Sequence, residues 1–223
     1  MTELFQCTAS LLSNFYNWKT GDMFLTDSEE DKPDVQVFVE RMDRPATSQM
    51  DVGTAFHKLL ETSSVGAHIG IIDSMGFTFD FTQLEATLQF PQIVEQRYFR
   101  KRDGVVVSGQ VDAIMGDGTI VDWKTCAAID PEKYTRSYQW RVYLWLTGLS
   151  KFRFDVFKIL PPTQKEPNIY RVTEHLPLEC HRYAAMDQDV ELLIDDFNHT
   201  MATCAPMREA VQRAAARRAL ENA

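Results

Sequence analysis

The residues whose types and spacing could support catalysis lie between positions 109 and 125, in the segment GQVDAIMGDGTIVDWKT. Side chains two positions apart on a strand share a face, so Asp122 and Lys124 should point the same way. If residues 116–118 form a three-residue hairpin loop with Gly118 left-handed, Asp112 falls directly across from Asp122. Their Cβ atoms would then be ~5 Å apart. The spacing therefore predicts two carboxylates and an ammonium on one face of a hairpin.

A third acid joins this set through the preceding hairpin. If Asp103 and Gly104 form a two-residue turn, Glu95 lies opposite Asp112 on the other side. A four-residue loop would instead place Glu95 opposite Gln110, on the same face of the sheet. Both alternatives bring Glu95 towards the other two acids.

These residue types suit the hydrolysis of a phosphodiester. Opposed carboxylates repel each other unless a cation lies between them. Mg²⁺ or Mn²⁺ prefers carboxylate oxygens, polarises a phosphate oxygen and acidifies a bound water, and a nearby ammonium stabilises the developing charge. The alternative is a hairpin with solvent-facing charges, which an isolated D-x-K pattern usually indicates. The convergence of three acids counts against that alternative.

The elements that must position these residues form an α/β pattern. Strands are predicted at 93–101, 105–115, 119–125, 151–160 and 169–175, and helices at 51–62, 132–149 and 179–223, with a break expected at Pro206. A short capped helix should follow Thr8. We therefore expect one domain over 1–223, with a core at about 51–175 and a C-terminal helical extension at about 179–223. Its fold class would be a mixed central β-sheet flanked by α-helices.

Composition narrows the class of protein. The net charge of −9 argues against a generic nucleic-acid coat, but not against a site that gathers acids around metal ions. No apolar run is long enough to cross a bilayer and the first residues do not resemble a signal peptide, so a cytoplasmic protein without membrane contact is expected. The four cysteines form no C-x-x-C pair, which predicts reduced thiols and no zinc site.

Taken together, these motifs resemble the RecB-like branch of the PD-(D/E)XK nuclease superfamily. That branch carries a G-x-x-x-H-x-x-x-E helix, an acid on one strand, a G-x-x-D strand, an acid-x-lysine-threonine strand and a Q-x-x-x-Y helix. The matching stretches are 53–61, Glu95, 109–112, 122–125 and 139–143, which read GTAFHKLLE, E, GQVD, DWKT and QWRVY. Each motif alone is weak, but all five occur in order between about 51 and 149.

The resemblance implies a role for each matching residue. His57, Asp112 and Asp122 would ligate the metal, with the backbone carbonyl of Trp123 as a further ligand. Lys124 would position the attacking water.

Three further residues receive less specific roles from the same resemblance. Glu95 would be a ligand or an acid just outside the ligand set. Gln139 and Tyr143, one helical turn apart, would contact the DNA backbone or brace the site.

The resemblance also implies a fold and an activity. The fold would be a restriction-endonuclease-like α/β core, and the activity a Mg²⁺- or Mn²⁺-dependent hydrolysis of DNA. No G-x-x-x-x-G-K-[ST] motif is present, so no nucleotide is expected, and the scattered cysteines predict no iron–sulfur cluster. Stand-alone members of this kind resemble phage-encoded or recombination-associated exonucleases, which favours end-directed degradation in recombination, repair or phage DNA processing.

Partners and rival functions follow from the same resemblance. DNA is the expected partner, and a single-strand-annealing or other recombination protein is compatible with it; an oligomer is allowed, although nothing in the sequence supports one. A phage-encoded protein would act in the host cytoplasm. The alternatives are a non-catalytic nucleic-acid-binding or assembly protein of the same fold, and an endonuclease or an RNA-directed nuclease.

Several other residues admit both a structural and a functional interpretation. Glu61 is interpreted first as a helix-face partner of His57 or Lys58. The aromatics after position 137 could stack on bases, but core positions are favoured for Trp140 and Trp145. The arginines near the C-terminus could bind phosphates, although a solvated helix face is favoured for them; they are Arg208, Arg213, Arg217 and Arg218.

Overall fold

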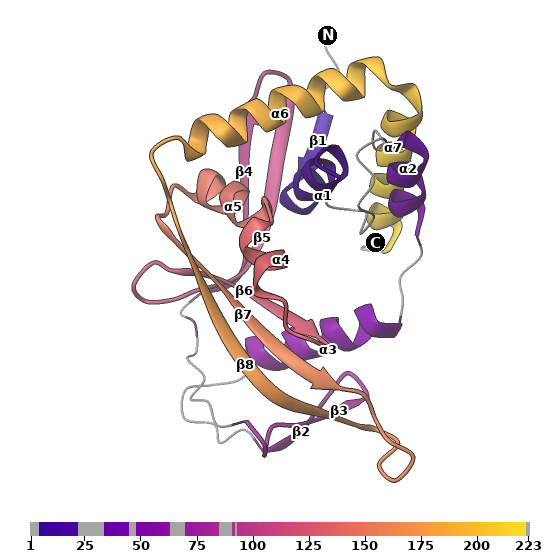
Figure 1. Cartoon of the computed structure of the whole chain (residues 1–223), viewed down its shortest axis with the longest axis vertical. Helices are drawn as coiled ribbons and strands as arrows, with labels where there is room; N and C mark the ends of the chain where they lie inside the picture. Colours follow the sequence, from indigo (N-terminus) through magenta and orange to yellow (C-terminus); the bar gives the residue numbers. More distant parts are fainter. Residues whose placement is uncertain are drawn as a thin grey trace.

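An eight-stranded mixed β-sheet forms the centre of the protein (Figure 1). The computed structural model describes residues 5–21, 34–44, 48–62, 70–84, 91 and 93–221. The strands are β1 (Phe5–Thr8), β2 (Ile71–Ser74), β3 (Phe77–Asp80), β4 (Ile93–Arg102), β5 (Val105–Ile114), β6 (Ile120–Cys126), β7 (Lys151–Leu160) and β8 (Ile169–His181). Their order is β1-β5-β6-β7-β8-β3-β2, and β4 pairs with the other side of β5. The pairs β1/β5, β6/β7 and β3/β8 are parallel, and the rest are antiparallel.

Helices cover parts of both faces of this sheet. They are α1 (Ala9–Lys19), α2 (Val35–Asp43), α3 (Ser48–Thr62), α4 (Pro131–Arg136), α5 (Gln139–Thr147), α6 (Met186–Thr203) and α7 (Ala205–Glu221). Figure 1 shows α6 crossing the upper end of the sheet, whereas α3 lies at its lower part. The predicted fold class, a mixed sheet flanked by helices, is confirmed. Within the described ranges, no helix combines the length and the apolar character needed to cross a membrane.

Two apolar clusters hold the helices to the sheet. Alternate residues of β7 divide between them, because successive side chains of a strand point to opposite faces. Phe154 and Val156 belong to the first cluster, with α1, α5 and α6, whereas Phe157 and Ile159 belong to the second, with α3. Trp145 of α5 is among the largest fully buried side chains. The core positions expected for Trp140 and Trp145 are therefore confirmed.

The first helix shows how local sequence sets its start. The hydroxyl of Thr8 accepts a hydrogen bond from the backbone N–H of Leu11 at 3.1 Å, which caps α1 as predicted. The strands predicted at 93–101, 105–115, 119–125 and 151–160 agree with β4, β5, β6 and β7 to within one residue at each end, whereas β8 extends six residues beyond the predicted 175.

Two predicted helices need correction. The single helix expected at 132–149 is two helices, because Ser137 adopts an extended backbone (φ −52°, ψ 135°) between α4 and α5. The helical extension expected from 179 begins at Met186, because β8 continues to His181 and pairs with Lys151. The break expected at Pro206 falls at Cys204 instead, since proline is tolerated in the first turn of the following helix.

Candidate active site

The β5–β6 hairpin has the geometry that its sequence predicts. Met115 donates its N–H to the carbonyl of Thr119 at 2.9 Å, and Gly118 has the left-handed φ of 81°. The side chain of Asp117 accepts the N–H of Thr119 at 3.0 Å and stabilises the loop. The predicted three-residue loop is therefore confirmed.

The two strands fork where the predicted acids lie. β5 pairs with β6 at Ala113–Val121, and the next position along the same register is Asp112–Asp122. There, the carboxylate of Asp112 accepts the backbone N–H of Trp123 at 2.9 Å. A side chain thus takes the place of a backbone acceptor, which holds the Asp112 carboxylate against β6.

The backbone of Glu95 is unusual at the same level of the sheet. Arg102 pairs with Val105 across the Asp103–Gly104 turn, so the register places Glu95 opposite Asp112. Glu95 has a φ of +51°, although it lies within a strand and not in a hairpin turn. Such left-handed backbone is uncommon for a residue with a side chain and often marks functional positions.

Asp122 and Lys124 form the most enclosed part of the site. Asp122 is only 2% exposed, and the Nζ atom of Lys124 lies 2.5 Å from its Oδ2 atom. The ammonium hydrogen-bonds to this carboxylate and is its charge partner inside the protein.

α3 brings a histidine to the same place. The Nδ1 atom of His57 lies 3.4 Å from Oδ2 of Asp112, and its ring also hydrogen-bonds to the backbone of Trp123. Burial lowers the pKa of His57, and the charge of Asp122 only partly opposes this effect. The imidazole is therefore neutral at pH 7, as a metal ligand must be.

The repulsion between the two carboxylates appears in the pKa of Asp112. Burial and then the charge of Asp122 raise the pKa of Asp112 to about 8. Burial alone would lower the pKa of Lys124, but the charges of Asp122 and Asp112 outweigh it and raise the pKa above its usual value. Lys124 is therefore a permanent cation, and Asp112 holds a proton at neutral pH when no other cation is near.

Glu61 belongs to this group of charges as well. It pairs with Lys58 at 3.0 Å, so the helix-face pairing expected from the sequence is confirmed. In addition, burial raises the pKa of Glu61, and the nearby Glu95 adds to this increase. The charge of Glu61 also raises the pKa of Asp112. The i,i+4 spacing from His57 was the signal in the sequence for this placement.

Tyr143 and Gln139 lie behind the acids on α5. Tyr143 is 5% exposed, and its hydroxyl donates to the backbone carbonyl of Gln110 at 2.9 Å. The amide of Gln139 in turn donates to the Tyr143 hydroxyl at 3.4 Å. Of the two roles left open by the sequence, this position suits bracing of the strand that carries Asp112.

The donor atoms suit a hard divalent cation in type but not yet in arrangement. Among the described residues, no three His, Cys, Asp or Glu side chains are positioned to hold a metal ion as they stand. The two carboxylates, a neutral imidazole and a backbone carbonyl are nonetheless ligands that Mg²⁺ or Mn²⁺ accepts. Burial and the charge of Asp122 together raise the pKa of Asp112, and a cation between the two carboxylates would oppose both effects.

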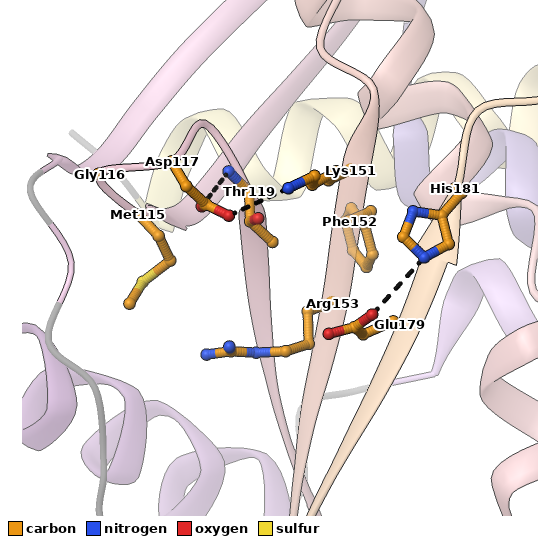
Figure 2. Close-up of a pocket in the computed structure, with 9 residues that line it drawn as sticks. All are labelled: Met115, Gly116, Asp117, Thr119, Lys151, Phe152, Arg153, Glu179 and His181. Carbon is orange, nitrogen blue, oxygen red and sulfur yellow. Dashed lines mark hydrogen bonds and ion pairs between the residues drawn. The ribbon is translucent and has the colours of Figure 1, made fainter.

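A polar pocket lies beyond the hairpin, away from the acids. Figure 2 shows it between the β5–β6 loop, the start of β7 and the end of β8. Its charged side chains are paired: Lys151 with Asp117 at 3.3 Å and His181 with Glu179 at 3.6 Å, while Arg153 pairs with Asp155 at 2.9 Å. This balance gives the pocket no clear preference for an ion of either sign.

Sequence reasoning missed a second buried carboxylate. Asp155 of β7 is 5% exposed and lies 2.9 Å from Arg153 and 3.1 Å from His175. His175 also stacks on the ring of Phe157. These residues are spread over two strands that pair only in the folded sheet, so no local motif indicated them.

The C-terminal arginines are partly engaged within the protein. Arg213 pairs with Asp43 of α2 at 2.8 Å, and Arg217 lies 3.7 Å from the same carboxylate. Arg208 donates to the backbone carbonyl of Met201 at 3.1 Å. The side chain of Arg218 lies outside the described residues. Arg213 and Arg217 thus help to dock α7 onto α2.

Comparisons with known proteins find likeness in structure alone. No protein-family model matches the chain, and no curated protein matches its sequence. The crystal structure of SSO0001 is 14% identical with a TM-score of 0.47, over 88% of this chain and 76% of that one. An alkaline exonuclease from Laribacter hongkongensis, LHK-Exo, is 13% identical with a TM-score of 0.39, over 99% of this chain and 96% of that one. LHK-Exo in complex with dAMP is 12% identical with a TM-score of 0.38 over the same shares. Likeness at this level assigns neither a family nor an activity to this chain.

Proposed function

We propose that this protein is a divalent-metal-dependent nuclease that hydrolyses the phosphodiester bonds of DNA. One observation carries the proposal: two carboxylates, Asp112 and Asp122, are held together at a fork in the sheet beside the ammonium of Lys124. A structural role alone would not favour an arrangement in which one acid must keep a proton at neutral pH.

The residues that would hold the cation come from three elements. They are Asp112 of β5, Asp122 and the backbone carbonyl of Trp123 on β6, and His57 of α3. When bound, Mg²⁺ or Mn²⁺ would polarise a phosphate oxygen and acidify a bound water. The proximity of Asp112 and Asp122 supports this ligand set, because a cation between them would relieve their repulsion and release the proton from Asp112.

Lys124 acts in this proposal as a fixed positive charge. Its raised pKa excludes a role as a base at neutral pH, since it would stay protonated. Its ammonium can instead orient the attacking water and stabilise the charge that develops on the phosphoryl group. The ion pair with Asp122 keeps the ammonium at the site before substrate arrives.

Glu95 and Glu61 flank the ligands and would either complete the ligand set or accept protons from water around it. Their carboxyls lie close enough for Glu95 to raise the pKa of Glu61. Gln139 and Tyr143 would keep β5 and its Asp112 in place through the hydrogen bond to Gln110.

The finer features of the proposal rest on the resemblance to stand-alone RecB-like nucleases. We infer end-directed degradation rather than site-specific cutting, in recombination, repair or phage DNA processing. A single-strand-annealing or other recombination protein would then be the natural partner. Covalently closed circular DNA distinguishes these modes, because an exonuclease needs an end.

The test is a cleavage assay on end-labelled linear duplex, single-stranded and closed circular DNA, with Mg²⁺ or Mn²⁺ and with EDTA as a control. Lys124→Ala should lower the rate about 100- to 1,000-fold, the usual effect of removing one charge-stabilising donor. Lys151→Ala is the matched control, because Lys151 is an exposed lysine paired with Asp117 in the pocket of Figure 2. It should cleave like the wild type.

Metal binding is measured separately by calorimetry. Asp112→Asn and Asp122→Asn should each weaken Mn²⁺ binding, whereas Lys151→Ala should not. Full activity in Lys124→Ala would overturn the proposed role of the lysine. A folded, metal-binding wild type that cleaves no DNA would favour the alternatives of a binding protein or an RNA-directed nuclease.

A further inference from the structure

One face of β4 carries a row of cationic and aromatic side chains. Arg97, Phe99 and Lys101 alternate along the strand, so they point to the same side of the sheet. The guanidinium of Arg97 donates to the side chain of Gln110, its register partner on β5, at 2.7 Å, which confirms that both lie on this face. We refer to Arg97, Phe99 and Lys101 as the β4 row.

The opposite face of β4 is partly covered by helices, and its two arginines are engaged. The guanidinium of Arg100 lies 4.2 Å from the ring of Trp145 and donates to that residue's carbonyl. Arg102 pairs with Glu191 at 2.7 Å and with Asp195 at 2.9 Å. These contacts fix α5 and α6 to this side of the strand.

The β4 row itself is open. Phe99 is 64% exposed, the largest exposed fraction among the described large apolar side chains. Among the described elements, β5 and α5 make the main contacts with β4, and α5 lies on the other face. Within the part of the chain that the structure describes, neither Arg97 nor Lys101 forms an ion pair with an acid. Both charges thus remain available to a ligand.

The row points directly at the candidate active site. Two residues before Arg97 along β4 is Glu95, which the register places opposite Asp112. Strands rise ~3.3 Å per residue, so the row and Glu95 together span roughly 20 Å. That length corresponds to about six nucleotides at the 3.4 Å spacing of a stacked strand.

The chemistry of the row selects a flexible polyanion with aromatic groups. Two cations flank a bare phenyl ring, on a protein whose net charge is −9. Proteins that hold single-stranded nucleic acid combine a cationic path for the backbone with aromatic rings on which bases stack. A base in a duplex cannot stack on a side chain in this way, because its neighbours already cover it.

We infer that the β4 row binds single-stranded nucleic acid and leads its backbone to the acids at Glu95 and Asp112. This inference rests on the proposed nuclease function, and it assigns the path by which substrate reaches that site. It places the scissile phosphate near the end of the row at Arg97, with Phe99 and Lys101 holding the nucleotides beyond it.

Binding is measured by fluorescence anisotropy with a labelled ten-nucleotide single strand, in EDTA so that no hydrolysis occurs. Phe99→Ala should weaken binding about 5- to 150-fold, the usual loss for one stacked base. Arg97→Ala and Lys101→Ala should each reduce the slope of log K against log salt by about 0.7. Affinity in the wild type should rise with strand length up to about six nucleotides and then level off.

The matched controls lie on the helix-covered side of the protein. Leu192→Ala removes an apolar side chain of α6 that is 59% exposed, and Lys19→Ala removes an exposed lysine of α1. Neither should change affinity or salt dependence. Because all these side chains reach solvent, each variant should melt like the wild type, and circular dichroism checks this.

The possible outcomes distinguish a failure of the β4 row as a binding site from a failure of the proposed nuclease activity. A wild type that hydrolyses a dinucleotide with Mn²⁺, while all three row variants bind and cut the ten-nucleotide strand like the controls, overturns the β4 row and keeps the nuclease. The β4 row is also overturned if the protein binds duplex as tightly as single-stranded DNA and Phe99→Ala binds both as tightly as the wild type. Binding that depends on Phe99 in a protein that cleaves nothing supports the row as a nucleic-acid site and overturns the nuclease.

Discussion

Gly109 offers a direct test of how α5 is seated on the strand that carries the candidate site. A Cβ atom at this position would lie 2.7 Å from Cε1 of Tyr143 and 2.8 Å from Cδ1 of Leu146. Carbon atoms in contact usually lie about 3.5–4.0 Å apart. Gly109→Ala therefore forces the side chains of Tyr143 and Leu146, or the helix that carries them, to move by roughly 1 Å.

The expected cost follows from two effects. Overpacking of this kind destabilises a protein by about 1–3 kcal/mol. Displacing Tyr143 also strains its 2.9 Å hydrogen bond to the carbonyl of Gln110, which is worth about 1 kcal/mol. We therefore expect Gly109→Ala to lower the free energy of unfolding by about 2–4 kcal/mol. Nuclease activity should fall further than the loss of folded protein explains, because Asp112 lies three residues along the same strand.

Gly53 is a matched control, because the same substitution there should raise stability instead of lowering it. A Cβ atom there would lie 3.5 Å from Oγ1 of Thr125, an ordinary contact, and Gly53 lies inside α3. Gly53→Ala should therefore raise stability by about 0.5–1 kcal/mol, through the helix preference of alanine and a less flexible unfolded chain.

The assay is urea unfolding followed by circular dichroism and by tryptophan fluorescence, with all variants at one pH. The two substitutions add the same methyl group, so their difference reports the space around each glycine. If Gly109→Ala proves as stable as Gly53→Ala, the close approach of Tyr143 and Leu146 to β5 is wrong, and so is the bracing role of Tyr143.

Three further predictions concern charged residues of the sheet. In EDTA, Asp112 should make stability fall between about pH 4 and pH 8 by on the order of a few kcal/mol, since the folded protein keeps on this residue, with its pKa of about 8, a proton that the unfolded chain releases near the usual 3.8. Urea titrations should find this downward slope smaller in Asp112→Asn than in the wild type, and an unchanged slope would contradict the raised pKa. Glu95→Gly should be more stable than Glu95→Ala by about 1 kcal/mol in thermal melts, because glycine alone tolerates the φ of +51° without strain, and equal stabilities would argue against that backbone. Asp155→Ala should lower the free energy of unfolding by about 3 kcal/mol, since it removes a buried carboxylate that both Arg153 and His175 contact, and a loss below about 1 kcal/mol would show that the cluster adds little.

The sequence by itself determined the local parts of the site. The Gly118 loop and the Asp103–Gly104 turn follow from residues that adopt left-handed backbone, and each turn fixes the register of its hairpin. Register then places Asp112 at the level of Asp122 and of Glu95, because counting along paired strands needs no knowledge of the rest of the chain. The mixed sheet and its flanking helices could be predicted for the same reason, from periodicity and turns.

Short or interrupted elements could not be predicted in this way. β1, β2 and β3 have four residues each, too few to show a period. β1 and β3 are strands because the longer β5 and β8 supply their hydrogen bonds, and β2 in turn pairs with β3. The division between α4 and α5 depends on Ser137, whose extended backbone and hydrogen bond to Ser13 are tertiary features.

Only the tertiary structure decided what surrounds the acids. It brought His57 and Glu61 of α3 to the fork between β5 and β6, and it buried Asp122 beside Lys124. Proton affinities depend on this burial and on charges from distant segments, so no local pattern could indicate a pKa of about 8 for Asp112. The same holds for the β4 row, since exposure of one strand face is settled by where the helices pack, and that is a property of the whole fold.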